Sequence, residues 1–372
     1  MVKDWPACRR IVHLSGGINA ISEPQCDLVT LWPNSIDNKT ATIRISTFGK
    51  LYSALEKLNL KILGVDFITH YSEAIGKVPM QFRGYVEQER IWPNWDAKEK
   101  WSGLALSSFH NKNGLAYDLS NRISYQLNTV NNRLRTLSLS YQNQLNSVVL
   151  KDDFRHEKRF QNGFTDLVYQ EFHSFLFDAC ILRDYLCEYI YNFSSNGVLK
   201  DGCKEVTTAS GLFKCLNKTE SLSKLEAELK YIMSKDGWLF ELGQYRDLVM
   251  HSAPINIANS QLYAIQEAIV LPDNKEIISV RFPLPDNPSL LYSERCKRND
   301  FDKYIRQFKE LNQMSLNNRG KYDCLEYAHM VFGLLSNLSV EVAEVSPYRP
   351  MQQKYILTKS GTISVPEYID KI

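Results

Sequence analysis

The sequence predicts a mainly α-helical fold: a helical bundle with a small α/β or β-rich domain at the N-terminus and a β-hairpin insertion. Three observations support this prediction. Apolar residues recur at steps of three and four between Leu115 and Val148, over roughly nine turns. A second apolar stretch covers residues 164–192. Short β-rich runs separated by turn signals dominate the first hundred residues.

We expect residues 1–110 to form the N-terminal domain. Three runs rich in β-branched and aromatic residues are typical of strands, and they cover residues 40–48, 61–69 and 78–91. Between the first two runs, Leu51 and Leu55 stand four positions apart, which predicts a helix over residues 49–59. No residue pattern in this domain indicates its role.

Residues 111–372 are predicted to form a helical domain. The long seam from Leu115 to Val148 needs a partner helix to cover it, and the stretch 164–192 is apolar on more than one face, which places it centrally. We therefore expect residues 113–260 to be almost entirely helical. Further helices are predicted for residues 221–234, 237–251, 300–315 and 322–337.

A β-hairpin is expected near residues 266–283, inside the helical domain. The run QEAIVLPDNKEIISVRFPLP contains two apolar, β-rich segments separated by PDNK, a typical turn sequence.

The composition excludes several classes of protein. With 44% hydrophobic residues, 23% charged residues and a net charge of +2, the chain is expected to be globular, and any nucleic-acid surface must be local. The eight cysteines show no zinc-ligand spacing and are expected to be reduced and buried. No run reaches the roughly 18 apolar residues of a membrane span. We therefore expect a cytoplasmic protein without a metal or other cofactor.

One short segment, GQYRDLVMHSAPI over residues 243–255, carries residues that suggest chemistry. Asp247 and His251 are four positions apart on the predicted helix, so the carboxylate can accept a hydrogen bond from the imidazole and orient it. Arg246 flanks the pair, and Pro254 favours a loosened last turn around His251. The opposite face, expected to pack on the bundle, carries Trp238, Leu242, Tyr245 and Val249.

The segment RDLVMH resembles the R-x4-6-H motif of the HEPN superfamily, which consists of small α-helical bundles. The resemblance covers roughly residues 160–260 and leaves the first hundred residues unexplained. It implies a metal-independent endoribonuclease of the toxin or antiviral-effector type, in which two copies of the motif meet across a homodimer. It also implies that Arg246 holds the phosphate, that His251 performs acid–base chemistry and that Asp247 orients the histidine.

The expected reaction uses the 2′-hydroxyl of RNA as the nucleophile and gives a 2′,3′-cyclic phosphate. Because one chain supplies a single Arg246 and His251 here, we expect a homodimer, with helix 237–251 and an exposed Phe240 at its interface. The expected partners are RNA and, for a toxin, an antitoxin or regulatory protein. Two alternatives remain open: a non-catalytic HEPN-like module that binds RNA or protein, and an ordinary solvated Asp–His pair.

For the other polar residues we expect structural roles rather than catalytic ones. His173 lies in an apolar helix and is expected to be a core histidine, while Glu171 and Asp178 are expected to have capping or surface roles rather than accessory roles beside the motif. Five basic residues near the bundle could contact RNA phosphates, although ordinary surface charge is the preferred interpretation. They are Arg133, Arg135, Arg155, Lys158 and Arg159.

Overall fold

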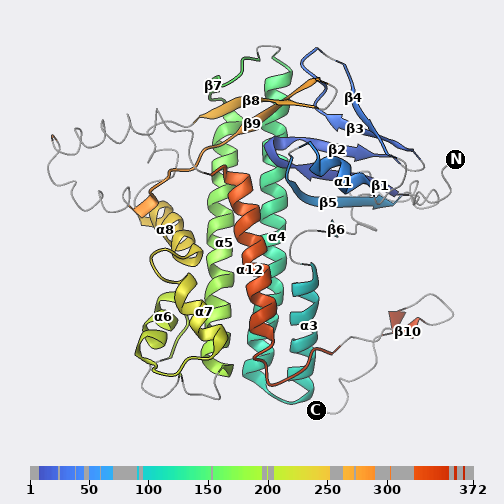
Figure 1. Cartoon of the computed structure of the whole chain (residues 1–372). Helices are drawn as coiled ribbons and strands as arrows, with labels where there is room; N and C mark the ends of the chain where they lie inside the picture. The colour runs from blue at the N-terminus through green and yellow to red at the C-terminus, as the bar shows by residue number, and fades with distance from the viewer. Residues whose placement is uncertain are drawn as a thin grey trace.

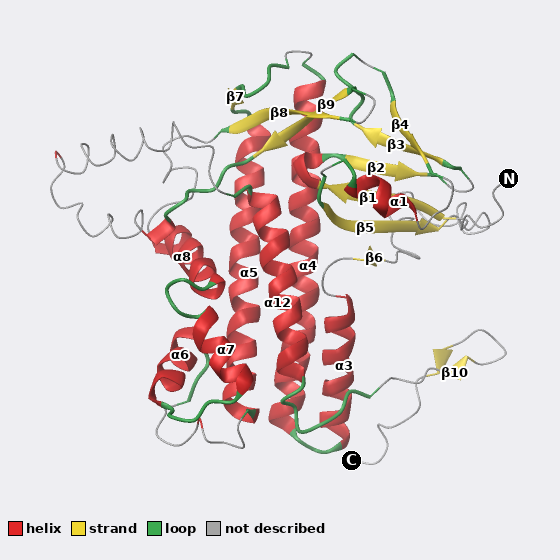
Figure 2. Cartoon of the chain, viewed as in Figure 1, coloured by secondary structure: helices red, strands yellow, loops and turns green. Residues whose placement is uncertain are grey.

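The computed structural model shows a mainly helical protein with an antiparallel sheet near its N-terminus (Figures 1 and 2). The structure describes residues 8–23, 26–37, 39–45, 50–58, 60–69, 90–91, 95–151, 154–194, 199, 205–251, 263–271, 274–289, 302, 322–351, 356–357 and 363–364.

Two long helices, α4 (Gly114–Val149) and α5 (Gly163–Phe193), lie side by side along the length of the molecule. Their bounds confirm the two helices predicted from apolar spacing. Each begins at an asparagine cap: Asn113 accepts a hydrogen bond from the backbone of Ala116, and Asn162 accepts one from the backbone of Phe164. These caps satisfy amide groups that the first turn of a helix leaves without a partner.

Helices α3 (Trp95–His110) and α12 (Cys324–Ala343) complete the bundle, with α12 in contact with α3, α4 and α5. The buried indole of Trp101 donates to the backbone carbonyl of Ser339, which ties α3 to α12. Helix α12 corresponds to the helix predicted over residues 322–337. The helix predicted over residues 300–315 lies outside the described residues, apart from Asp302.

The N-terminal sheet is antiparallel, with strand order β4-β3-β2-β1-β5-β6. The short helix α1 (Lys50–Glu56) lies in the connection between β4 and β5, as predicted. The strands are β1 (Cys8–Leu14), β2 (Asn19–Ser22), β3 (Leu28–Trp32), β4 (Ala41–Arg44), β5 (Ile62–Thr69) and β6 (Arg90–Ile91). Strands β4 and β5 confirm the first two predicted runs. Most of the third run, residues 78–89, lies outside the described residues.

A tight turn places this sheet against the bundle. The short 3-10 helix η1 (Ser15–Gly17) joins β1 to β2 and contacts α4. Gly17 has φ +80, and a β-carbon at this position would lie 2.8 Å from the backbone oxygen of Tyr141. Only glycine allows this backbone conformation and this close approach together.

A second sheet, of order β7-β8-β9, contains the predicted hairpin. Strands β8 (Ala264–Val270) and β9 (Glu276–Arg281) confirm the hairpin expected near residues 266–283. Strand β7 (Arg159–Phe160) pairs with β8 and interrupts the span 113–260 that was expected to be almost entirely helical. The connector becomes extended here because its backbone hydrogen bonds go to β8, including Gln266 N–H to the Lys158 carbonyl.

Three shorter helices lie beside α5: α6 (Ala209–Lys218), α7 (Lys224–Ile232) and α8 (Trp238–His251) (Figure 1). Helices α7 and α8 correspond to two of the predicted helices. Ser223 and Glu226 form a capping box that starts α7, as the pattern of small polar and acidic residues indicates. Near the end of the described chain, β10 (Ile356–Leu357) pairs with β11 (Ile363–Ser364).

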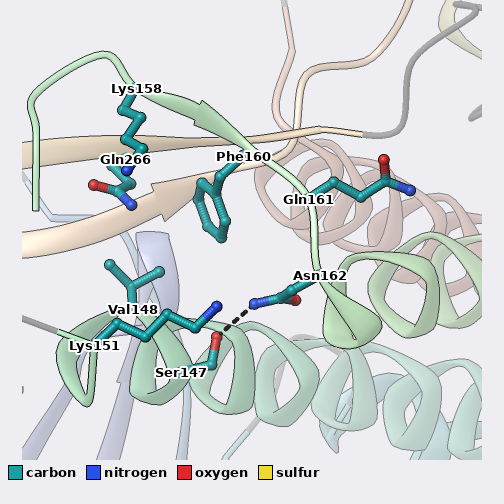
Figure 3. Close-up of a pocket in the computed structure, with 8 residues that line it drawn as sticks. All are labelled: Ser147, Val148, Lys151, Lys158, Phe160, Gln161, Asn162 and Gln266. Carbon is teal, nitrogen blue, oxygen red and sulfur yellow. Dashed lines mark hydrogen bonds between the residues drawn. The ribbon is translucent and has the colours of Figure 1, made fainter. Parts of the chain in front are cut away.

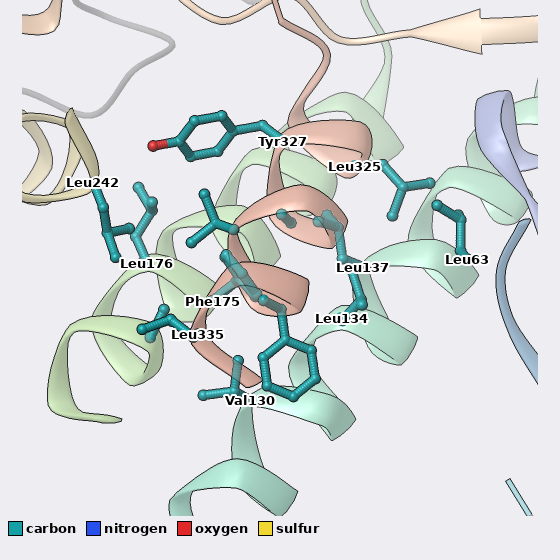
Figure 4. Close-up of a cluster of buried hydrophobic side chains, with 14 of the residues drawn as sticks. Leu63, Val130, Leu134, Leu137, Phe175, Leu176, Leu242, Leu325, Tyr327 and Leu335 are labelled. Carbon is teal, nitrogen blue, oxygen red and sulfur yellow. The ribbon is translucent and has the colours of Figure 1, made fainter. Parts of the chain in front are cut away.

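One continuous hydrophobic core joins these parts (Figure 4). Leu134 of α4, Phe175 of α5 and Leu335 of α12 are fully buried at its centre, and Leu63 of β5 and Leu242 of α8 join the same cluster. Helix α3 precedes the predicted boundary at residue 110 and yet packs against α4 and α12. The division into residues 1–110 and 111–372 stays a prediction. Among the described residues, no helix has the length and apolar character needed to cross a membrane.

Candidate functional site

Helix α8 carries all three residues of the predicted site. The spacing of its buried residues determines which face packs against the core. Its buried residues are Leu239, Leu242, Tyr245 and Leu248, at uniform steps of three. The face predicted from the sequence included Leu242 and Tyr245 correctly, but Trp238 and Val249 are only half-buried. The buried arc points in the predicted direction but is wider, because Leu239 and Leu248, one at each edge of it, are buried as well.

Arg246 and Asp247 form an ion pair on the half-exposed side of α8. Nε of Arg246 lies 3.1 Å from Oδ1 of Asp247, and the two side chains are 28% and 30% exposed. Nη1 of Arg246 also contacts Sδ of Met250 at 3.5 Å. The guanidinium is thus held close to the helix surface, with part of its edge accessible to a ligand.

His251 is the last residue of α8, and it is exposed. It follows Arg246 by five positions, about 140° around the helix, so the two side chains leave the helix in different directions. The segment with Pro254, predicted to loosen this turn, lies outside the described residues. The expected hydrogen bond between Asp247 and His251 stays a prediction, since the ion pair that the structure defines for Asp247 is with Arg246.

A groove of about 650 Å³ opens beside α8, between this helix, α5, α6 and the turn that joins α7 to α8. Arg246 and Asp247 line it, whereas His251 is not among its lining residues. Phe213 and Phe240 supply apolar surface to the same groove. Phe240, expected to be an exposed interface residue, is half-buried here.

A second arginine in the groove, Arg183 of α5, was not identified from the sequence. Its side chain is 6% exposed, and its Nε and Nη2 lie 3.0 Å and 2.9 Å from Oδ1 of Asp184. The same Asp184 oxygen accepts a hydrogen bond from the backbone of Ala209, so the pair fixes the start of α6. Gly243 of α8 faces Arg183, since a β-carbon there would lie 3.2 Å from Nη1.

Arg183 and Arg246 both influence the pKa of one buried residue, Cys180. Burial raises the pKa of the Cys180 thiol, and the positive charges of Arg183 and Arg246 oppose this increase. Cys180 is buried, so it is a neutral thiol rather than a nucleophile. The groove is therefore lined by two arginines, each beside a carboxylate, together with apolar and polar side chains.

The remaining polar candidates are engaged elsewhere. Asp178 and Glu171 pair with Arg133 of α4, at 2.8 Å and 4.0 Å, and neither lines the groove beside α8. Arg135 is bound to the buried Asp66 of the sheet. Burial lowers the pKa of His173 to about 4, but its side chain is only half-buried, at the edge of the core rather than inside it as predicted.

Comparison with known proteins adds no relative: no family model, no curated protein and no solved structure matches the chain. The resemblance to the HEPN superfamily therefore rests on the residues of the motif. Within the described ranges, no group of three or more His, Cys, Asp or Glu side chains is arranged to hold a metal ion.

Proposed function

We propose that the chain is a HEPN-like, metal-independent endoribonuclease with Arg246, Asp247 and His251 as its catalytic residues. The observation that carries the proposal is the position of the Arg246–Asp247 pair, which lines a groove large enough for part of an RNA strand. An accessible guanidinium is suited to a phosphodiester because it offers several fixed N–H donors to the phosphate oxygens.

The proposed reaction needs a base near the 2′-hydroxyl, an acid near the leaving 5′-oxygen and a cation at the phosphate. His251 supplies acid–base chemistry, Arg246 stabilises the charge that develops on the phosphate, and Asp247 holds the arginine and orients the histidine. The 2′-hydroxyl attacks the phosphorus and the 5′-oxygen leaves with a proton, which gives a 2′,3′-cyclic phosphate.

A homodimer would bring a second His251 and Arg246 to the reaction. Met250 supports this part of the proposal, because it is 52% exposed beside the Arg246 guanidinium, and exposed methionines are enriched at protein interfaces. The two-fold axis would run near the C-terminal end of α8. A toxin or antiviral effector of this kind acts in the cytoplasm and takes an antitoxin or a regulatory protein as its partner.

A specific observation favours a second candidate, a module that binds RNA or protein without cutting it. Arg183, Arg246 and Asp247 line the groove, but His251 does not. A single chain can therefore hold an anionic ligand in the groove without presenting an imidazole to it. The two candidates differ in a single property, which is the chemical conversion of bound RNA.

The experiment that separates them incubates purified protein with total RNA in the presence of EDTA. The wild-type protein should cut the RNA to products that end in a 2′,3′-cyclic phosphate, and His251→Ala should not. His110→Ala is the matched control, because His110 is also an exposed histidine at the last position of a helix, α3. RNA that is bound but left intact by all three proteins would support the binding module instead.

A further inference from the structure

A small pocket lies far from the groove, at the other end of α5 (Figure 3). It occupies about 100 Å³ between the end of α4, strand β7 and strand β8. Its residue Asn162 caps α5, whereas Arg183 of the groove lies 21 positions further along the helix. At 1.5 Å per residue this separation is about 30 Å, so the pocket is distinct from the candidate active site.

The floor of the pocket is a hydrogen-bonded pair, Ser147 of α4 and Asn162. Nδ2 of Asn162 donates to Oγ of Ser147 at 2.8 Å, and Oγ in turn donates to the backbone carbonyl of Gln144. Oδ1 of Asn162 accepts from the backbone of Phe164. The acceptor atoms of the floor are therefore occupied within the protein, and the second N–H of the Asn162 amide remains as a donor.

The wall opposite is formed by Gln266 of β8, a side chain that is buried at 4% exposure. Its Oε1 accepts a hydrogen bond from the backbone of Arg155 at 2.9 Å. This contact fixes the amide with its Nε2 as the remaining polar group, and Nε2 has no hydrogen-bond partner among the described residues. This N–H group faces the pocket, where it can donate a hydrogen bond to a ligand.

Two lysines complete the lining. Lys158, the residue before β7, extends toward Gln266, and Lys151, just after the end of α4, extends toward Ser147 (Figure 3). Each ammonium group carries three donors and no acceptor. None of the described residues that line the pocket is acidic. Val148 and Phe160 form the apolar part of its wall.

We infer that this pocket binds a phosphate group, as inorganic phosphate or as the phosphate of a small phosphomonoester. Nε2 of Gln266, the second N–H of Asn162 and the two lysine ammonium groups are all donors, and two of these groups are cationic, so an anion with several acceptor oxygens is the complementary ligand. The pocket has room for several water molecules or one tetrahedral oxyanion. The start of α5 adds the positive end of a helix of 31 residues.

Equilibrium dialysis of the full chain against radiolabelled inorganic phosphate tests the inference. We expect saturable binding of one phosphate per chain, with competition by adenosine 5′-monophosphate and none by adenosine. Competition by the nucleotide assigns the pocket to phosphomonoesters as well, whereas its absence assigns the pocket to the free anion. Because charge-assisted hydrogen bonds dominate such a site, Lys158→Gln and Lys151→Gln should each weaken binding by at least about tenfold.

Lys214→Gln is the control, because Lys214 is an exposed lysine of α6 outside both the groove and the pocket. It should bind phosphate like the wild type. The double variant Lys151→Gln/Lys158→Gln should lose binding and keep the circular dichroism of the wild type, since both changes affect solvent-accessible charge. The absence of saturable binding up to ~10 mM phosphate, or unchanged binding by the double variant, would overturn the inference.

Discussion

Oδ2 of Asp66 on β5 lies 2.7 Å from both Nε and Nη2 of Arg135 on α4. Asp66 is nearly fully buried, and Nε2 of His13 lies 3.5 Å from the same oxygen. Burial alone would raise the pKa of Asp66, but the His13 ring and the Arg135 guanidinium hold this pKa well below its usual range. This ion pair links the N-terminal sheet to the bundle.

Replacing Asp66 tests the contribution of this link to stability. At pH 7, Asp66→Asn should lower the free energy of unfolding by ~3 kcal/mol, because Arg135 loses its charged partner in a poorly solvated site. A carboxylate with a lowered pKa in the folded state stabilises the protein above its unfolded pKa, near 4, and this stabilisation is lost as the pH falls below that value. Urea denaturation should therefore show the two proteins converging below pH 4. A difference that stays constant down to pH 2 would contradict this explanation.

The glycine at position 17 is expected to be essential for seating the sheet. Gly17→Ala should destabilise the protein by ~2 kcal/mol or more, because alanine disfavours φ +80 and its β-carbon would meet the backbone of Tyr141 at 2.8 Å. Gly114→Ala is the control, since a β-carbon there has no neighbour within 4 Å. The control should stay within ~0.5 kcal/mol of the wild type in thermal unfolding. Equal losses in both variants would show that the close approach is unimportant.

The sequence predicted α4 and α5 well because their apolar residues keep helical spacing over many turns. Over that length, a few residues that break the pattern do not change the prediction. It did not predict β1, β2 or β3. These strands have four to seven residues. Strand β1 carries two charged or polar residues whose partners lie outside it: Arg9 pairs with Glu23, and His13 contacts Asp66 and Ser138. In such short segments, pairing with neighbouring strands and docking on α4 determine the structure more than local pattern does.

The sequence predicted the helical segment that carries the candidate site, but it did not predict the groove beside that segment. The motif in α8 identified Arg246, Asp247 and His251 from neighbouring positions in the sequence. Arg183 could not be found in this way, because its surroundings come from three separate elements: Gly243 of α8, Ala209 of α6 and Asp184 of its own helix. The available signal was that Arg183 is the one arginine in α5.

Arg183 and Arg246 should both contribute to RNA affinity. In a His251→Ala background, which prevents cleavage under the proposed function, Arg246→Ala should weaken binding of a fluorescent oligoribonucleotide by about tenfold. Arg183→Lys keeps the charge but loses the planar arrangement of donors, so a smaller loss is expected. Fluorescence anisotropy at several salt concentrations measures the RNA affinities of both arginine variants, with Lys214→Gln as the control. Affinities unchanged by both arginine variants would place RNA outside the groove.

Asp247 should act by position rather than by charge. Asp247→Asn keeps an oxygen that can accept hydrogen bonds from Arg246 and His251, so cleavage should stay within about threefold of the wild-type rate. Asp247→Ala removes the acceptor and should slow cleavage by about tenfold. Initial rates of RNA cleavage under identical conditions compare the two. A larger loss in the asparagine variant than in the alanine variant would contradict this role.

The central claim is that His251 cuts RNA through the 2′-hydroxyl without a metal ion. The most direct test is the initial rate of cleavage of a fluorogenic oligoribonucleotide in EDTA, beside the same oligonucleotide with 2′-O-methyl groups throughout. We predict that the wild-type protein cuts the first and not the second, and that His251→Ala slows cleavage of the first by at least ~100-fold. Cleavage of the methylated strand, a requirement for added Mg²⁺, or an unchanged rate in His251→Ala would contradict the claim.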